Sequence, residues 1–433
     1  MKLKVFTVFI LFMYCLNAQQ NKEDYANDNF FRFDNFIYKS SIKTVLCHES
    51  SFEMNPPEID LHSDQKIQLS FDDLEGGFKT YQYTFFHCDA NWNPDDLMIS
   101  EYLTGFFDDQ ITNRSASFNT VVSYTHYTCS FPNTAIRFSK SGNYIIMVYE
   151  NGNKDEPIIS RKFRIFENLV SLSARIHQPL GSDVLYNTHE VDFSIFFTQY
   201  QLTNPATDVK VVITQNDRFD NSITSLKPLF IKDKELSYDY DDGSNCFPAV
   251  NEFRVLDIKS SRYPGPTTQR LFRDSASTVF QVILKKDEPR TFKRYVFSPD
   301  INGRYLIKSN EASNSTTEAD YMEVTFFLPF EYPTDNGNVY LVGGFNQFQP
   351  TKENKMHYDK LNKGYTCKLL LKQGYFNYYY SFLRDGDTRL DPEYFEGNLG
   401  QTENDYAIYV FHRTTGTFYD RLICAKHFNS VKN

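Results

Sequence analysis

Aromatic residues placed at every second position are the feature that most restricts the fold of this chain. The 433 residues include 41 Phe and 30 Tyr, and both residue types favour the half-buried, pleated surface of a strand. Short alternating runs bounded by Gly, Pro, Asn and Asp recur along the sequence, whereas few long stretches show a helical period of apolar positions. The pattern predicts an all-β protein of the antiparallel sandwich type.

The length of the chain predicts two or three domains, because a single hydrophobic core rarely extends over so many residues. We predict consecutive Ig-like β-sandwich domains over residues 19–168, 169–314 and 315–433. A Ser-, Thr- and Asn-rich stretch at 309–318 is typical of a linker or exposed loop. The stretch 227–248 is long, acidic and irregular, which indicates a functional or mobile loop. The best candidate strands span residues 66–70, 78–88, 117–131, 144–150, 161–167, 170–177, 190–197, 209–215, 251–258 and 279–285.

Two segments show which face of a strand is expected to be buried. Residues 363–383 alternate on both sides of a tight turn at Gly374, as in an antiparallel hairpin. On its return strand, the side chains expected in the core are Phe376, Tyr378, Tyr380 and Phe382. Those expected in water are Asn377, Tyr379 and Ser381. Along residues 161–167, one expected face carries Phe163 and Ile165, and the other carries Lys162, Arg164 and Phe166.

The N-terminus has the pattern of a signal peptide. Lys2 and Lys4 precede an apolar run that ends near residue 16, and Ala18 provides a small residue before Gln19. We therefore predict a signal peptide at residues 1–18, and we assign Cys15 to the removed segment because Tyr14 precedes it instead of the small residue of a lipoprotein signal. No later run is long and apolar enough to predict a transmembrane helix, so the mature chain is expected to be soluble after export.

The net charge of −10 argues against two classes of partner. Nucleic acid requires a basic footprint, and anionic lipid surfaces attract clustered Lys and Arg. The net charge does not by itself indicate a specific partner.

The search for catalytic and metal-binding motifs is negative. The sequence has no nucleophile elbow, zinc helix or phosphate-binding glycine loop. The run 89–95 resembles a calcium loop only weakly, since Pro94 stands where the turn glycine belongs, and an Asx-rich turn explains it better. Six cysteines lie beyond the signal peptide without CxxC spacing; Cys88 and Cys129 are candidates for a disulfide, and the alternative is that most are small buried hydrophobes. We expect no enzyme activity and no cofactor.

One segment has an unusually individual composition. Residues 71–106 read FDDLEGGFKTYQYTFFHCDANWNPDDLMISEYLTGF and contain the only Trp of the chain. The segment resembles part of the type IX secretion system plug protein family. The resemblance continues, in order, through SFNT at 117–120, YTHY at 124–127, KSGNY at 140–144, NEFR at 251–254, DING at 300–303, ADY at 319–321, LKQGY at 371–375, EGN at 396–398, TENDY at 402–406 and YDRLI at 419–423.

This resemblance implies a function, a location and a partner. Members of the family are periplasmic proteins that occlude the outer-membrane translocon of type IX secretion when it is idle. The implied partner is the barrel of that translocon, and the implied location is the periplasm, at the outer membrane through the partner and without direct membrane insertion.

The last predicted domain suggests an alternative function. The stretches 339–346 and 374–378 resemble the early-set modules that bind glycogen in relatives of AMP-activated kinase. A periplasmic carbohydrate-binding protein is therefore the second hypothesis, with a glycan as ligand. Such modules usually use a Trp where this chain has Phe348, so Phe348 and Tyr379 are the candidate sugar-stacking residues.

The loop at 89–107 combines aromatic and acidic side chains, as interface centres and rims do. We predict that it forms part of the surface that faces the translocon. Trp92 has two interpretations, a core residue of the first domain or an anchor for the partner. The candidate contact residues are Trp92, Asp95, Asp96, Glu101, Phe106 and Phe107.

Overall fold

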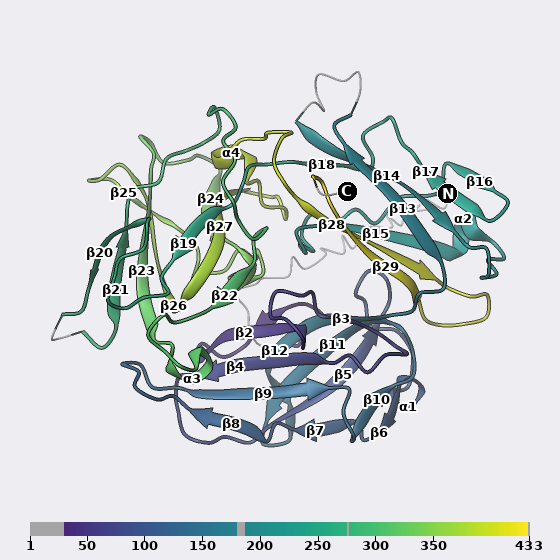
Figure 1. Ribbon diagram of the computed structural model, residues 1–433, viewed down its shortest axis with the longest axis horizontal. Coiled ribbons are helices and arrows are strands. Elements are labelled where there is room, and N and C mark those ends of the chain that lie inside the picture. The colour runs from purple at the N-terminus through teal and green to yellow at the C-terminus, as the bar shows by residue number, and fades with distance from the viewer. Residues whose placement is uncertain (1–29, 180–186, 275–276, 432–433) are drawn as a thin grey trace, which may run out of the picture.

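Strands form almost all of the regular structure in the computed structural model, which describes residues 30–179, 187–274 and 277–431 (Figure 1). The predicted signal peptide and Cys15 lie outside these residues. The described helices are single turns: α1 (Ile99–Tyr102), α2 (Pro205–Asp208), α3 (Ser315–Glu318), α4 (Glu393–Glu396) and the 3-10 turn η1 (Gly344–Asn346). The expectation of a multidomain protein built of antiparallel sheets is confirmed at this level.

The first unit consists of two facing sheets. One sheet has the strand order β1-β12-β11-β5-β7, with β3 beside β12; the other has the order β2-β4-β9-β8, and β6 and β10 form a separate pair. The strands are β1 (Phe36–Ile37), β2 (Ile42–Glu49), β3 (Glu58–Asp60), β4 (Ile67–Asp73), β5 (Tyr81–Cys88), β6 (Leu103–Gly105), β7 (Asp108–Gln110), β8 (Asn113–Ala116), β9 (Thr125–Phe131), β10 (Ile136–Phe138), β11 (Gly142–Glu150) and β12 (Asn153–Phe166).

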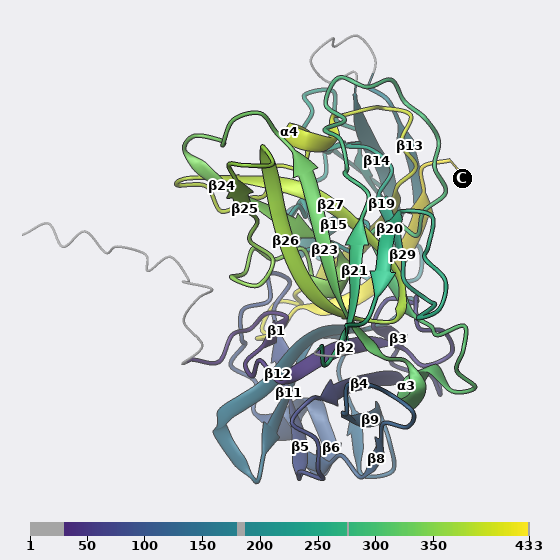
Figure 2. The same ribbon diagram turned by 90° about the vertical axis from the view of Figure 1, so that its left-hand side faces the viewer.

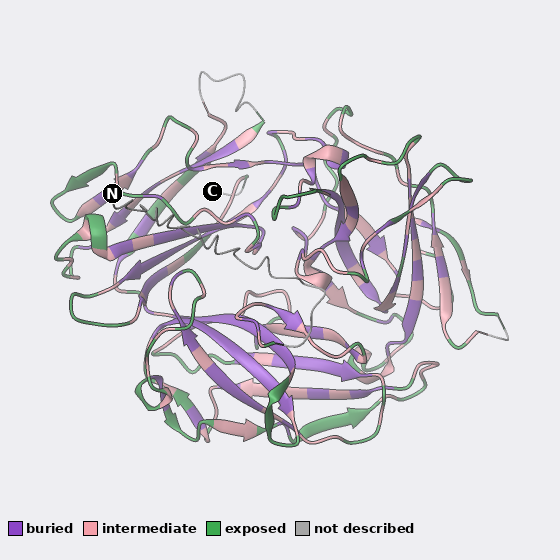
Figure 3. Ribbon diagram, turned by 180° about the vertical axis from the view of Figure 1, so that it is seen from behind, coloured by how far each residue is buried: buried purple, intermediate pink, exposed green. Residues whose placement is uncertain are grey.

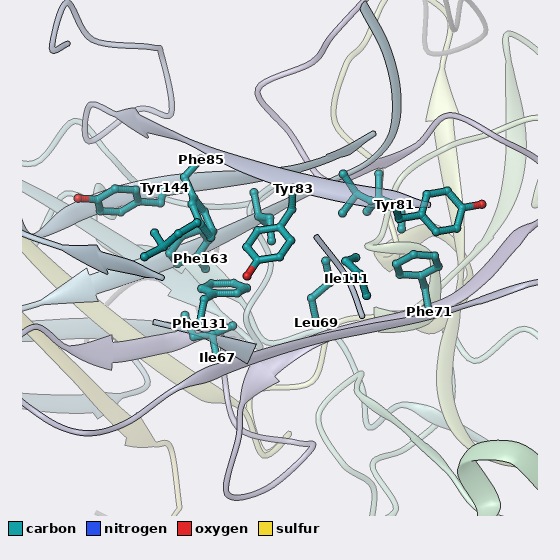
Figure 4. Packing of buried hydrophobic residues seen from close by; sticks show 14 of the residues in the cluster. Ile67, Leu69, Phe71, Tyr81, Tyr83, Phe85, Ile111, Phe131, Tyr144 and Phe163 are labelled. Atoms are coloured by element: carbon teal, nitrogen blue, oxygen red, sulfur yellow. The ribbon is translucent and has the colours of Figure 1, made fainter. Parts of the chain in front are cut away.

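Aromatic side chains fill the space between these two sheets. Figure 4 shows the alternate residues Tyr81, Tyr83 and Phe85 of β5 pointing toward Phe71 and Phe131 on the opposite sheet. The rings of Phe85 and Phe131 lie 4.9 Å apart, edge to face. Burial of each such side chain stabilises the fold by about 1.5–3 kcal/mol, so the alternation seen in the sequence is what holds the sandwich together.

The middle unit is built from two distant parts of the chain. Its first sheet has the order β13-β14-β17-β16, with β18 beside β14, and its second has the order β15-β28-β29. Three of these strands lie within the stretch 227–248, so the expectation of an irregular loop there was wrong. The strands are β13 (Ser171–His177), β14 (Thr188–Phe196), β15 (Val209–Gln215), β16 (Phe230–Lys232), β17 (Glu235–Tyr238), β18 (Cys246–Pro248), β28 (Asp405–His412) and β29 (Arg421–Asn429).

The third unit contains the strands between these two parts. One sheet has the order β19-β27-β22, with β24 beside β27, and the other has the order β20-β21-β23-β26-β25. The strands are β19 (Arg254–Asp257), β20 (Thr268–Phe272), β21 (Phe280–Leu284), β22 (Tyr305–Ile307), β23 (Tyr321–Pro329), β24 (Gly337–Val342), β25 (His357–Asp359), β26 (Gly364–Lys372) and β27 (Gly374–Arg384).

The division expected at residues 314 and 315 does not coincide with these units. The pairing of Val211 with Val410 joins β15 to β28, and Ile408 and Val410 lie in the core of the middle unit. The stretch 309–318 is not a linker between units either, because α3 lies inside the third unit and the Tyr124 hydroxyl of the first unit donates to the carbonyl oxygen of Ala319 (2.8 Å). Sequence order alone does not reveal such a returning hairpin.

The three units surround a common centre. Figures 1 and 2 show the first unit below the other two, which stand side by side above it. Figure 3 shows β11 and β12 buried over most of their length, and β27 is likewise buried on both faces. Asn377, Tyr379 and Ser381 are 0–1 % exposed, so the face of β27 that was expected to be wet is covered. Lys162 and Arg164 of β12 are covered in the same way.

Candidate interaction surface

Trp92 lies at the junction of the first and middle units. A turn places it there, because the Asp89 carboxylate accepts the backbone N–H groups of Asn91 (2.8 Å) and Asn93 (2.9 Å). The Trp92 ring meets Phe219 of the middle unit edge to face, with centroids 5.5 Å apart. The Arg164 guanidinium stands 5.1 Å from the centre of the indole ring. Trp92 is therefore neither a core residue of the first unit nor a free anchor; it helps to join two units.

Asp95 is a structural partner of a buried histidine. Its carboxylate forms a short hydrogen bond with Nδ1 of His87, and both side chains are almost completely buried. The other carboxylate oxygen accepts the backbone N–H of Leu97 (3.2 Å). The next residue, Asp96, is exposed. The two adjacent contact candidates therefore differ, because the side chain of Asp95 is buried and that of Asp96 faces water.

The remaining loop residues form an exposed face, which we call the Phe106 face: Met98, Glu101, Phe106 and Phe107, with Asp96. Glu101 caps α1 by accepting the backbone N–H of Met98 (2.8 Å). The side chains of Met98, Phe106 and Phe107 are 72 %, 70 % and 41 % exposed.

The backbone beneath the two rings is held firmly. The Phe106 N–H donates to the Ala135 carbonyl (2.9 Å), and the Phe107 carbonyl accepts the Thr84 hydroxyl (2.8 Å). Large apolar side chains on a fixed backbone are typical of a surface that is covered by a partner.

A second exposed apolar segment was not predicted from the sequence. The chain between β21 and β22 contains no helix or strand, and within it Phe292, Val296 and Phe297 are 99 %, 74 % and 58 % exposed. Tyr295 holds the segment in place by donating to the Glu252 carboxylate (2.6 Å). The available signal was the length of this connection, since long irregular loops in compact units are usually functional. The residue types alone, FKRYVF, resemble a strand.

Phe348 and Tyr379, the candidate sugar-stacking residues, are not accessible. They are 5 % and 1 % exposed, and both belong to a small apolar cluster between units. Phe253 stacks on Tyr379 with ring centroids 3.8 Å apart, and Arg218 stands 4.8 Å from the centre of the Phe348 ring. Neither ring has a free face for a pyranose, so the structure contradicts this glycan site.

The cysteines and acidic clusters provide no other site. The cysteines in the described part of the chain are free thiols, so the candidate disulfide between Cys88 and Cys129 is absent. Burial raises the pKa of Cys47 to about 12, which makes it a poor nucleophile. Within residues 30–179, 187–274 and 277–431, no three His, Cys, Asp or Glu side chains are placed to hold a metal ion. The same residues contain no helix of the length and apolarity needed to cross a membrane.

The geometry defines a class of protein: a multidomain β protein with exposed apolar faces on a firmly held scaffold. Residues 42–167 match the family described as "Type 9 secretion system plug protein 1st domain", and this range covers β2 to the end of β12 in the first unit. The first unit therefore belongs to the family of type 9 secretion system plug protein first domains.

A solved structure resembles nearly the whole chain. The crystal structure of a hypothetical protein from Parabacteroides merdae ATCC 43184 at 2.30 Å resolution has a TM-score of 0.88 and 32 % sequence identity. The match covers 92 % of this chain and 100 % of that one. No curated protein shows significant similarity to the chain.

Proposed function

We propose that the chain is a periplasmic, non-enzymatic plug that occludes the outer-membrane type IX secretion translocon when no substrate passes. The family match of the first unit is the observation that carries this proposal. In this role the chain is held at the outer membrane by its partner and does not insert into the bilayer. We interpret its three units as Ig-like sandwiches, the third of them of the early-set type.

Occlusion of a wide pore requires a body that does not come apart. Ion pairs bridge each of the three junctions between units, and the pair at the first and third units is almost completely buried. The bridging pairs are Asp72–Lys372 (2.7 Å), Glu167–Arg421 (2.6 Å) and Asp217–Arg304 (2.6 Å). A buried pair resists separation because parting it leaves a charge without its partner. The three units are therefore expected to move as one wide body and not as separately moving domains.

We assign the contact with the translocon to the Phe106 face, with the apolar segment around Phe292 and Phe297 as a second contact. Exposed apolar rings on the same segment as the exposed carboxylates of Asp96 and Glu101 suit an interface that buries apolar area yet remains releasable. A specific interface of this kind buries more than about 1,000 Å² in total. The other two candidates, Trp92 and Asp95, contribute by fixing the shape of the loop.

Co-purification tests the assignment of the partner. A tagged full-length chain is expressed in a bacterium that secretes by the type IX route, the envelope is extracted with mild detergent, and the captured proteins are quantified by mass spectrometry. We expect a large outer-membrane barrel to be the main captured protein. Phe106→Glu with Phe107→Glu should reduce its capture at least tenfold, whereas Leu361→Glu, at a 95 % exposed position between β25 and β26, should not. Capture of periplasmic proteins without any outer-membrane barrel would refute the proposal.

A further inference from the structure

A cavity of about 140 Å³ lies where the three units meet. Arg161 and Arg164 line it from the first unit, Thr214 and Tyr409 from the middle unit, and Arg304 from the third unit. We call this space the junction cavity. Its walls carry several charged side chains, and buried charges are unfavourable unless they are paired. Which of these charges has a partner is therefore the next question.

Most of the charges around the cavity are paired within the protein. Asp34 binds Lys162 (2.8 Å), and Arg304 binds both Asp217 (2.6 Å) and Asp405 (3.0 Å). Glu58 accepts the Tyr409 hydroxyl (3.0 Å) and forms an ion pair with His427. Burial raises the pKa of Glu53, a further wall residue, and so favours its neutral form.

Neither Arg161 nor Arg164 forms a contact ion pair of this kind. They are 4 % and 6 % exposed, and no carboxylate among the described residues lies within 4.0 Å of either guanidinium. Arg161 donates only to the carbonyl oxygens of Phe36 (3.1 Å) and Ser160 (2.8 Å). Arg164 stands 3.7 Å from the centre of the Tyr409 ring, which attracts the cation without accepting its N–H groups.

Three residues that line the cavity each carry a buried donor atom without an acceptor in the described part of the chain: Nε of Arg161, Nε of Arg164 and the hydroxyl of Thr214. The Glu58 carboxylate attracts Arg164 without a hydrogen bond and balances part of its charge, but each unsatisfied buried donor remains unfavourable. Guanidinium groups bind the oxygens of tetrahedral anions particularly well, because their planar donors match the spacing of two oxygens. An oxyanion in the cavity would supply acceptors and negative charge to the arginine residues that line it.

We propose that the junction cavity binds one small tetrahedral oxyanion, of the phosphate or sulfate class, through its unpaired guanidinium groups. The ion supplies the acceptors that the wall lacks and connects residues of neighbouring units. Its binding stabilises the arrangement of the three units and belongs to the architecture of the chain, whether or not the chain is a plug.

Thermal unfolding of the mature full-length chain tests this site. Phosphate or sulfate is titrated at constant ionic strength, with chloride making up the difference. We expect a saturable rise of roughly 2–4 °C in Tm, because a ligand that binds only the folded state stabilises it. Isothermal titration calorimetry with sulfate should give one site per chain, and 31P line broadening separates phosphate from sulfate as the preferred ion. A Tm that depends on ionic strength alone would show that the cavity holds water and would overturn the proposal.

Variants of the wall locate the effect. Arg164→Met should abolish the rise in Tm, whereas Arg114→Met, at an exposed position of β8, should preserve it. If Arg164→Met does not fold, Thr214→Val serves instead, since it removes one cavity donor at almost constant volume and should weaken sulfate binding several-fold. An unchanged rise in these wall variants would place the anion elsewhere and refute the assignment.

Discussion

Asp95 and Asp96 illustrate how adjacent residues of the same type have different roles. Asp95→Ala leaves buried His87 without its side-chain partner, so we expect the free energy of unfolding to fall by about 1–3 kcal/mol. Asp96→Ala is the matched control, and its unfolding curve should coincide with that of the unmodified chain because Asp96 is exposed. Urea denaturation followed by tyrosine fluorescence measures both. Equal stability of the two variants would contradict the role given to Asp95.

His427 makes stability depend on pH at the junction of the first and middle units. Burial alone would lower its pKa, but the adjacent Glu58 carboxylate outweighs burial and raises the pKa of His427 to about 9. A histidine whose pKa is higher in the folded state stabilises the fold fully below the unfolded pKa of about 6.5 and loses this contribution as the pH rises through 9.

The unfolding free energy should therefore fall between pH 6.5 and 9. In His427→Gln the fall should be clearly smaller, since the variant has no proton to lose at this position. Chemical denaturation of both proteins across this range provides the measurement. Parallel pH profiles would show that the pair does not control stability.

At the scale of the element, alternation in the sequence predicted the positions of strands better than it predicted which segments pack on their two faces. It predicted the core residues Phe376 and Tyr378 of β27, and both lie in the core of the third unit. It also predicted a wet face at Asn377, which is instead covered: its side-chain oxygen accepts the N–H of Ile301 (2.7 Å) and of Gly303 (3.2 Å). A polar residue in a junction between units has the same sequence signal as one in water, because both are hydrogen-bonded.

The candidate contact residues show the same limit. Phe106 and Phe107 were predicted to be on the surface and are exposed, whereas Trp92 meets Phe219, which lies 127 positions later and could not be anticipated from local pattern. Contact of Phe106 and Phe107 with the translocon remains a prediction. Local periodicity predicts which side chains of a strand are buried. It does not predict which distant segment packs against them.

The returning hairpin β28–β29 leads to a prediction about fragments. Residues 169–314, the middle domain expected from the sequence, contain only β15 of the sheet β15-β28-β29. We expect this fragment to remain unfolded, because the apolar face of its other sheet has no cover. Residues 30–167 contain both sheets of the first unit and should fold, with a cooperative melting transition. Circular dichroism of the two fragments checks this, and a cooperatively folded 169–314 fragment would contradict the division into units described above.

At the scale of the whole molecule, the arrangement of three joined units suits the proposed role of a steric plug. A steric plug needs width, rigidity and a releasable contact. The bridged junctions provide rigidity, and the exposed side chains of the Phe106 face are the proposed contact. The similarity of 92 % of the chain to one solved structure indicates that this arrangement is shared beyond the first unit.

The most direct test of the plug is the ionic conductance of the purified translocon barrel in a planar bilayer, measured while the mature chain is added to the periplasmic side. We predict a saturable loss of conductance. Phe106→Glu with Phe107→Glu should require at least tenfold more protein for the same block, because two apolar contacts are replaced by charges. Leu361→Glu, a control at a 95 % exposed position of the third unit, should change the required concentration little. Conductance that stays unchanged while the chain is demonstrably bound to the barrel would contradict the account.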